Sequence, residues 1–206
     1  ALLGWSPGGD VEFFSKEQMA ESFSLERVNP NPARFDVKKC TAINGDWIRH
    51  LAIDDLVERL VPYLQRDGVI GSIPSAEDMN LVRAVVPLIS ERLETLGQAS
   101  AMVGFLFTDD ITIDPGDAEK IMGDQAGDVL QAAEAALAGL DEWTTEAIEG
   151  ALRAALIDER GLKPKVAFGP VRLAITGRRV SPPLFESMEL LGADRSLDRI
   201  RSLHAS

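Results

Sequence analysis

Hydrophobic residues recur three and four positions apart along most of this chain, which is the spacing of one face of an amphipathic α-helix. In residues 54–65 the apolar positions are Leu56, Val57, Leu60, Val61 and Leu64. A longer run of the same kind follows Ser75 and reaches Leu96, with a kink or break expected near Pro87. Residues 98–107 add a further apolar helix. Because no alternation of apolar and polar residues extends over five positions, the pattern predicts an all-α fold.

Capping residues mark where these helices are expected to begin and end. Side-chain oxygens at a helix start accept hydrogen bonds from the free N–H groups of the first turn. The predicted N-caps are Ser15, Asp36, Ser75, Thr144 and Asp194. Glycine adopts the left-handed backbone that ends many helices, as expected at Gly68, Gly161 and Gly177. Asn44-Gly45 is expected to interrupt the helix that Asp36 begins, with Asp46 opening another turn.

The stretch KPKVAFGPVRLAITGRRVSPPLFESMELLG, residues 163–192, contains the most distinctive candidate chemistry. An apolar helix ends at Gly177 and leads into a turn that contains Arg178 and Arg179. The next helix is expected to start at Ser181-Pro182, with serine as N-cap and proline as first residue. A helix N-terminus beside these arginines and Arg172 suits an anionic or acceptor-rich ligand. The alternative is a surface helix hairpin with solvated arginines.

An Asn-Pro-Asn-Pro segment breaks the helical pattern nearer the N-terminus. Each proline pushes the residue before it toward extended backbone, so residues 28–33 are expected to form a stiff, non-helical strut. The basic helix that follows would present cationic side chains to phosphates, which position a nucleic acid without reading its sequence. These side chains are Arg34, Lys38, Lys39 and Arg49. Alternatively the two lysines are solvated surface residues; Phe35, Ile43 and Trp47 are expected in the core.

The charge of the chain is unevenly distributed, and this changes what the net value of −12 implies about partners. Residues 108–149 contain twelve acids and one lysine, which is a net charge of −11. Residues 150–206 have a net charge of +4, and residues 1–107 a net charge of −5. An acidic middle that faces away from a nucleic acid would leave two basic surfaces to steer it. The same acids would also serve simply to keep a helical surface soluble.

Several classes of protein are disfavoured by what the sequence lacks. No apolar run approaches the roughly 18 residues of a membrane span, so we expect no membrane partner. The single cysteine, Cys40, excludes an internal disulfide and suits a reducing cytosol, so we expect a cytoplasmic protein. A glycine-rich phosphate loop is absent, and His50 and His204 lie far apart. We therefore expect no catalytic residue, metal site or cofactor in this chain, and a binding role is favoured over catalysis.

Two long stretches resemble signatures of bacterial glutamyl-tRNA synthetases. One is residues 163–192, and the other is FSLERVNPNPARFDVKKCTAINGDWIRH, residues 23–50. The resemblance implies an elongated array of helical subdomains of the anticodon-binding type. The His-Ile-Gly-His-like and Lys-Met-Ser-Lys-Ser-like motifs of the catalytic domain are missing, so we expect a tRNA-binding part whose catalytic half precedes Ala1. The parent enzyme would attach glutamate to glutamate tRNA, tRNA(Glu), as a monomer that uses ATP and Mg²⁺, whereas this chain alone would be inactive.

The resemblance also implies roles for individual residues near the anticodon. Arg92 aligns with the arginine that recognises the third anticodon base, a cytosine in glutamate tRNAs and a guanine in glutamine tRNAs. Without the resemblance, Arg92 would be a surface ion-pair residue between Glu91 and Glu94. Arg172 aligns with an arginine near the anticodon, and the base-contacting surface is matched by Ser181, Pro182, Leu184 and Phe185. Leu184 and Phe185 could equally be core residues, and some relatives have threonine in place of Ser181 and glycine in place of Pro183.

Contacts to the tRNA backbone are expected from Lys39 and Asn44 first, and then from Lys38, Arg49, Arg178 and Arg179. The expected division is a stem-contact segment at 1–52 and two anticodon-binding helical subdomains at 53–113 and 114–206. A different class of function stays open: a helical protein-interaction module that uses the acidic middle and apolar grooves would not prefer one tRNA over another.

Overall fold

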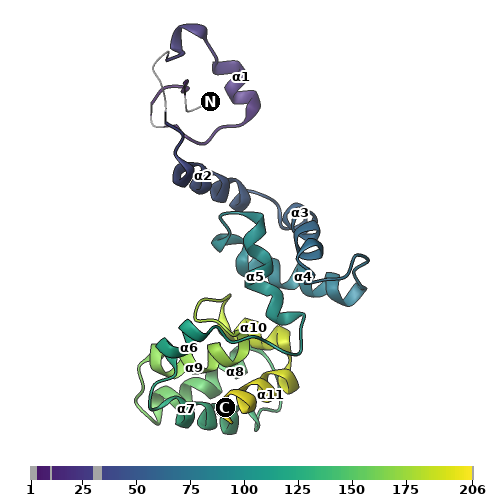
Figure 1. The fold of residues 1–206 in the computed structure, drawn as a ribbon, viewed down its shortest axis with the longest axis vertical. Helices are drawn as coiled ribbons and strands as arrows, with labels where there is room; N and C mark the ends of the chain where they lie inside the picture. The colour runs from purple at the N-terminus through teal and green to yellow at the C-terminus, as the bar shows by residue number, and fades with distance from the viewer. Residues whose placement is uncertain (1–3, 10, 30–33, 206) are drawn as a thin grey trace.

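The computed structural model describes residues 4–9, 11–29 and 34–205, and these residues form helices and loops without a strand. The molecule is elongated, with the N-terminal segment at one end and the C-terminal helices at the other (Figure 1). The all-α prediction is therefore confirmed. Positions 30–33 of the predicted Asn-Pro-Asn-Pro strut lie outside the described residues.

The N-terminal part contains α1 (Lys16–Ser22), η1 (Leu25–Arg27) and α2 (Val37–Arg49). Both predicted N-caps are confirmed, because the Ser15 and Asp36 side chains accept hydrogen bonds from backbone N–H groups of their first turns. Ring contacts hold this part together: Trp5 packs on Phe14, and Phe13 lies 4.2 Å from Trp47 between ring centroids. The second contact attaches the segment before α1 to the face of α2. Trp47 is nevertheless 41% exposed and Phe35 is 58% exposed, so the expectation that both lie in the core is wrong.

The predicted interruption of α2 at Asn44-Gly45 is wrong, because the helix runs unbroken through both residues. Gly45 is buried where α2 meets the loop after η2 (Ser90–Arg92). A Cβ atom on Gly45 would lie 3.4 Å from the Leu93 carbonyl oxygen and from the Glu94 Cα. At this distance a Cβ atom would make ordinary van der Waals contact, so Gly45 packs against the neighbouring backbone within a continuous helix and does not end it.

The middle of the molecule is built from α3 (Ile53–Arg66), α4 (Ala76–Ile89), η3 (Leu96–Gln98), α5 (Ala99–Val103) and η4 (Gly104–Leu106). The apolar stripe of α3 packs on α4 and α5. The break expected near Pro87 is confirmed, because α4 ends at Ile89, two residues after this proline. The rest of the apolar run to Leu96 forms short 3₁₀ turns and loops. The single apolar helix expected at 98–107 is likewise divided between α5 and η4.

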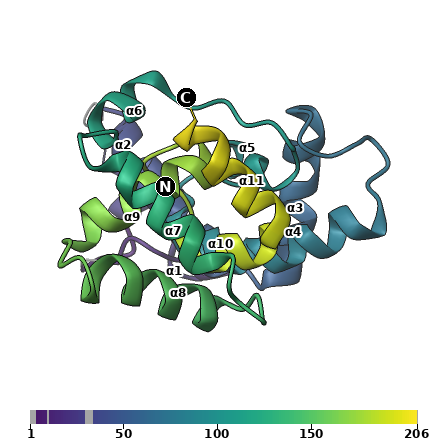
Figure 2. The same ribbon diagram turned by 90° about the horizontal axis from the view of Figure 1, so that it is seen from below.

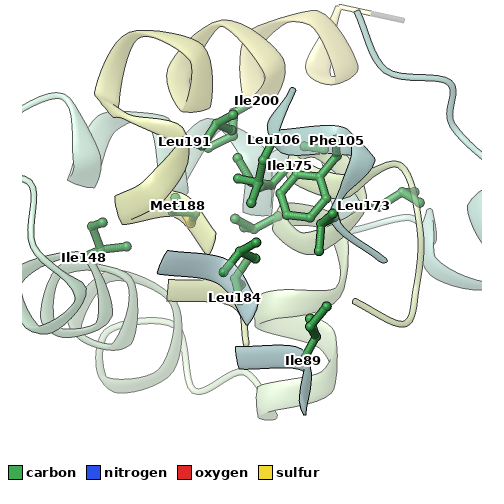
Figure 3. Close-up of a cluster of buried hydrophobic side chains, with 14 of the residues drawn as sticks. Ile89, Phe105, Leu106, Ile148, Leu173, Ile175, Leu184, Met188, Leu191 and Ile200 are labelled. Carbon is green, nitrogen blue, oxygen red and sulfur yellow. The ribbon is translucent and has the colours of Figure 1, made fainter. Parts of the chain in front are cut away.

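The C-terminal part consists of α6 (Pro115–Ile121), α7 (Ala126–Leu137), α8 (Thr145–Arg153), the π-helical turn η5 (Ala154–Asp158), α9 (Pro164–Thr176), α10 (Leu184–Leu191) and α11 (Ala193–His204). In this part α7 contacts α8, α9 and α11, as the view from below indicates (Figure 2). The buried side chains of α9, α10 and α11 meet Phe105 and Leu106 of η4 in one apolar cluster (Figure 3). The core is thus continuous from the middle of the molecule into its C-terminal part.

Two predicted helix starts in this part are wrong. The helix after the basic turn begins at Leu184, because the Ser181 hydroxyl donates to the Pro182 carbonyl oxygen and caps no helix. The last helix begins at Ala193, which places Asp194 inside its first turn. By contrast, Gly177 ends α9 with φ +72°, as predicted. Its carbonyl oxygen accepts a hydrogen bond from the Asp114 N–H, so this helix end is also tied to the start of α6.

A buried arginine that sequence reasoning missed joins the middle to the C-terminal part. Arg199 on α11 is 6% exposed. Its guanidinium donates to the carbonyl oxygens of Phe105 at 2.8 Å, Thr108 at 2.5 Å and Ile175 at 2.7 Å. Burial, with a smaller effect of Arg195, lowers the pKa of Arg199 to about 10, so the side chain remains protonated at neutral pH. Arg199 lies on the same buried face of α11 as Ser196, Ile200 and Leu203. A charged residue type gave no reason to expect it there.

Candidate nucleic-acid interface

Two arginines that are far apart in the sequence meet at Ser181. Arg92, at the end of η2, donates to the Ser181 carbonyl oxygen at 2.5 Å. Arg172, on α9, donates to the Ser181 hydroxyl at 2.6 Å and to the Pro182 carbonyl oxygen at 2.8 Å. The structure therefore brings together the two arginines that the sequence singled out, and it does so through the segment between α9 and α10.

The positive charge at this place is largely uncompensated. Burial lowers the pKa of Arg172, and the nearby positive charge of Arg92 lowers it further, while Glu186 acts in the opposite direction. Among the described residues, neither arginine forms an ion pair, whereas Arg49, for example, pairs with Asp46. Two guanidinium groups held together in this way favour a ligand that supplies acceptor atoms or negative charge.

The predicted base-contacting residues differ in how far they reach the surface. Ser181, at 5% exposure, and Pro182 are buried, and Leu184 belongs to the apolar cluster (Figure 3). These three residues therefore support the surface of the site from inside the protein. Of the two alternatives for Leu184, the structure shows the core position. Phe185 packs on the same core but keeps part of its ring accessible, so it is the member of the set that offers a ring surface to a ligand.

The two arginines of the basic turn have different surroundings. The backbone N–H of Arg179 donates to the Asp117 carboxylate at 2.8 Å, and its guanidinium Nε lies 3.6 Å from the same side chain. The Arg178 side chain is exposed and has no hydrogen bond or ion pair within the described part of the chain. Asp117 of α6 thus orients the turn and leaves Arg178 as its more available cation.

The predicted backbone contacts on α2 are exposed or half-exposed, but most have intramolecular partners. Lys39 forms an ion pair with Glu12, and Arg49 pairs with Asp46 at 2.5 Å. Asn44 donates through Nδ2 to the Glu94 carbonyl oxygen at 2.6 Å. Lys38 is exposed, and its side chain has no partner among the residues that the structure describes. Surface ion pairs of this kind are weak, so they leave the cations available to a polyanion.

A line of hydrogen bonds connects α2 to the Ser181 segment. Asn44 on α2 holds the Glu94 carbonyl oxygen, and two residues earlier Arg92 holds the Ser181 carbonyl oxygen. The segment 90–94 therefore contacts the N-terminal and the C-terminal helices at once. The sequence singled out Asn44 as a helix break and as a contact to the tRNA backbone, but neither expectation indicated this junction.

Replacing Asn44 by alanine tests the structural part of this junction. We expect Asn44→Ala to lower the free energy of unfolding by about 1 kcal/mol, because the Glu94 carbonyl oxygen loses its side-chain donor. Urea unfolding followed by tryptophan fluorescence measures the change. Asn80→Ala is the matched control, since Asn80 is exposed on α4 and makes no side-chain hydrogen bond within the described residues. An equal effect of both substitutions would contradict a structural role for Asn44.

Three other features of the described residues concern metal binding, cavities and membrane spans. In the described part of the chain, histidine, cysteine and acidic side chains do not gather into a group that could hold a metal ion. A cavity of about 360 Å³ between the N-terminal segment and α2 is mainly apolar, and Cys40 on its wall is a free, exposed thiol. A search of the described helices finds none with the length and apolarity to cross a membrane.

Known proteins are similar to this chain in sequence and in fold. A family model described as "Anticodon binding domain" matches residues 55–203. The chain is 53% identical over 203 residues to a glutamate–tRNA ligase of Saccharopolyspora erythraea and 51% identical over 208 residues to one of Kineococcus radiotolerans. These matches cover 98% and 100% of this chain but 40% and 41% of the relatives. The chain thus spans about two fifths of their length.

Solved structures of lower sequence identity have a similar fold. A glutamate tRNA ligase from Elizabethkingia meningosepticum, crystallised in complex with its amino acid, matches with a TM-score of 0.80 at 20% identity. A glutamate-tRNA synthetase from Elizabethkingia anophelis matches with a TM-score of 0.79 at 21% identity. Each match covers 100% of this chain and 39% of the other protein. At this identity the likeness concerns the fold alone, and it agrees with the predicted elongated helical array.

Proposed function

Because this chain belongs to the anticodon-binding domain family, we propose that it is the tRNA-recognition part of a glutamate–tRNA ligase and that its partner is glutamate tRNA. The single observation that carries the proposal is the meeting of Arg92 and Arg172 at Ser181, where neither arginine forms an ion pair with a residue that the structure describes. Unpaired anticodon bases can be splayed out and bound on their pairing edges by such donors. The identity of about 50% to glutamate–tRNA ligases over the whole chain supports this partner.

The ligase reaction itself is proposed for the longer parent protein. Its ATP and Mg²⁺ would be bound in the part of the relatives that this chain does not match, since the chain contains no glycine-rich phosphate loop. This chain would supply binding of the tRNA and would not charge it. We place the parent in the cytoplasm as a monomer, and a single exposed cysteine suits that reducing compartment.

Arg92 is proposed to recognise the third anticodon base. Among the described residues its only hydrogen-bond acceptor is the Ser181 carbonyl oxygen, so most donors of its guanidinium are available to a cytosine. Arg172 would hold the Ser181-Pro182 segment in place and add positive charge behind the base. Phe185 would offer an aromatic face, while Ser181, Pro182 and Leu184 would shape the surface on which the bases lie.

The tRNA backbone is proposed to follow the molecule from α2 toward the basic turn. The contacts would come from Lys38, Lys39, Asn44 and Arg49 on α2 and from Arg178 and Arg179 after α9. The corresponding division is a stem-contact segment at 1–52 and anticodon-binding subdomains at 53–113 and 114–206. Exposed large apolar residues are concentrated in the first of these, including Phe23, Leu25, Phe35, Val37 and Trp47. An apolar surface of this kind suits packing against the remainder of the parent protein.

Salt dependence of binding tests the proposed backbone contacts. The five cationic side chains among them would release counterions from phosphates, so the logarithm of the affinity should fall with the logarithm of salt concentration with a slope of about −4. Filter binding or fluorescence anisotropy of the whole chain with glutamate tRNA measures this slope. An affinity that does not change with salt would contradict phosphate contacts. Equal affinity for unrelated tRNAs at every salt concentration would instead favour a module without tRNA specificity.

A further inference from the structure

Three side chains from three helices form a partly exposed row beside the arginine site. Arg153 at the end of α8 lies over the Phe168 ring, with its Cζ atom 5.9 Å from the ring centroid. Phe168 on α9 packs edge to face with Phe185 on α10, with 5.4 Å between ring centroids. Arg153 is exposed and both phenylalanines are partly accessible. We call these three residues the aromatic ridge.

The aromatic ridge is continuous with the site at Ser181. Phe168 and Arg172 are four residues apart on α9, so they lie on one face of the helix about 6 Å apart along its axis. Phe185 lies in the first turn of α10, directly after the segment that Arg92 and Arg172 hold. A single-stranded segment bound at the two arginines would therefore meet the aromatic ridge next.

We propose that the aromatic ridge stacks an unpaired base of the anticodon loop that flanks the bases bound at Arg92 and Arg172. This inference rests on the proposed function of the chain. Aromatic rings and guanidinium planes are the surfaces on which proteins stack unpaired bases, and such stacking does not require a particular base. The ridge would thus extend the binding site by one nucleotide and add affinity without changing the anticodon preference.

Neighbouring residues fix the orientation of the aromatic ridge before a ligand binds. Both rings pack on the apolar core with part of their surface, so their orientation is set before anything binds. The Arg153 guanidinium is held by Glu149, with 2.6 Å between its Nε and the carboxylate oxygen, while half of the side chain remains accessible. Binding a base on a surface that is already ordered costs little conformational entropy.

The test uses the whole chain and the anticodon stem–loop of glutamate tRNA with 2-aminopurine in one of the two loop positions that flank the anticodon. Its fluorescence reports stacking of the labelled base. With the natural chain, we expect binding to change the fluorescence at one of the two positions. With Arg153→Gln and with Phe168→Leu, we expect this change to be lost and the affinity to fall about tenfold. Phe168→Trp should show the fluorescence change and the affinity that Phe168→Leu loses, because tryptophan also offers a ring on which a base can stack.

Arg66→Gln is the matched control for Arg153→Gln. Arg66 also lies over an aromatic ring, 5.0 Å from the centroid of Tyr63, and also pairs with one carboxylate, that of Asp67. Its substitution should leave the fluorescence change and the affinity as they are. If the natural chain binds the stem–loop with anticodon preference but Arg153→Gln and Phe168→Leu change nothing, the ridge proposal is overturned and the proposed function stands. If the natural chain does not bind the stem–loop at all, the proposed function itself fails.

Discussion

Replacing Gly177 by alanine is expected to lower the free energy of unfolding by about 3 kcal/mol. The residue has φ +72°, a left-handed conformation that costs alanine about 1–2 kcal/mol. A Cβ atom at this position would also lie 2.5 Å from the Thr112 carbonyl oxygen, so the backbone of one of the two segments must move. Such overpacking typically adds about 1–3 kcal/mol.

Gly68→Ala separates the two contributions to this loss. Gly68 has the same φ of +72°, but a Cβ atom there would meet nothing within 4 Å. We therefore expect it to cost about 1–2 kcal/mol, which is the conformational part alone. Urea unfolding monitored by fluorescence measures both variants, and Trp143, which donates to the Met188 carbonyl oxygen, reports on the C-terminal part. Equal losses at the two glycines would show that the approach of Thr112 to Gly177 carries no cost.

Replacing Arg92 by glutamine is expected to reduce the preference for glutamate tRNA over glutamine tRNA between tenfold and a hundredfold. A guanidinium offers only donors, which suit the acceptors of a cytosine and meet the donors on the pairing edge of a guanine. Pairing of an arginine fork with a base contributes about 1–3 kcal/mol of discrimination. Glutamine carries both a donor and an acceptor, so it removes most of this difference.

The preference is measured as the ratio of the dissociation constants of the whole chain for the two tRNAs. Arg83→Gln is the control, because Arg83 is an exposed arginine of α4 without a hydrogen bond or ion pair in the described part of the chain. It should weaken both complexes slightly and equally. A preference that Arg92→Gln leaves unchanged would remove Arg92 from base recognition. The fold of the variant is checked separately, since the hydrogen bond to Ser181 is lost as well.

Local sequence patterns predicted the helices well but misjudged some of their ends. The apolar stripe of α3 and the N-caps at Ser15, Asp36 and Ser75 are confirmed, because each depends on residues within one or two turns. Asn44-Gly45 and Ser181-Pro182 were misread for a common reason. Their side chains and backbone interact with distant segments, and these contacts override the local preference for a break or a cap.

The residue types of the candidate site were predictable from the sequence, but the contacts between those residues were not. The residue types and a family resemblance pointed to Arg92 and Arg172, and whether they bind a base stays a prediction. Their meeting at Ser181, the burial of Pro182 and the aromatic ridge follow from the structure. The spacing of residues along the sequence indicates none of these contacts, because the partners lie on different helices or loops.

The sequence by itself determined that the chain is helical, where several of the helices begin, and that Gly177 ends α9. These properties depend on periodicity and on the backbone preferences of single residues, which act over a few positions. Only the tertiary structure decided that Arg199 is buried against three carbonyl groups and that Arg92 reaches a residue 89 positions away. Such contacts depend on how helices pack against one another, and the pattern along any one helix does not specify its neighbour.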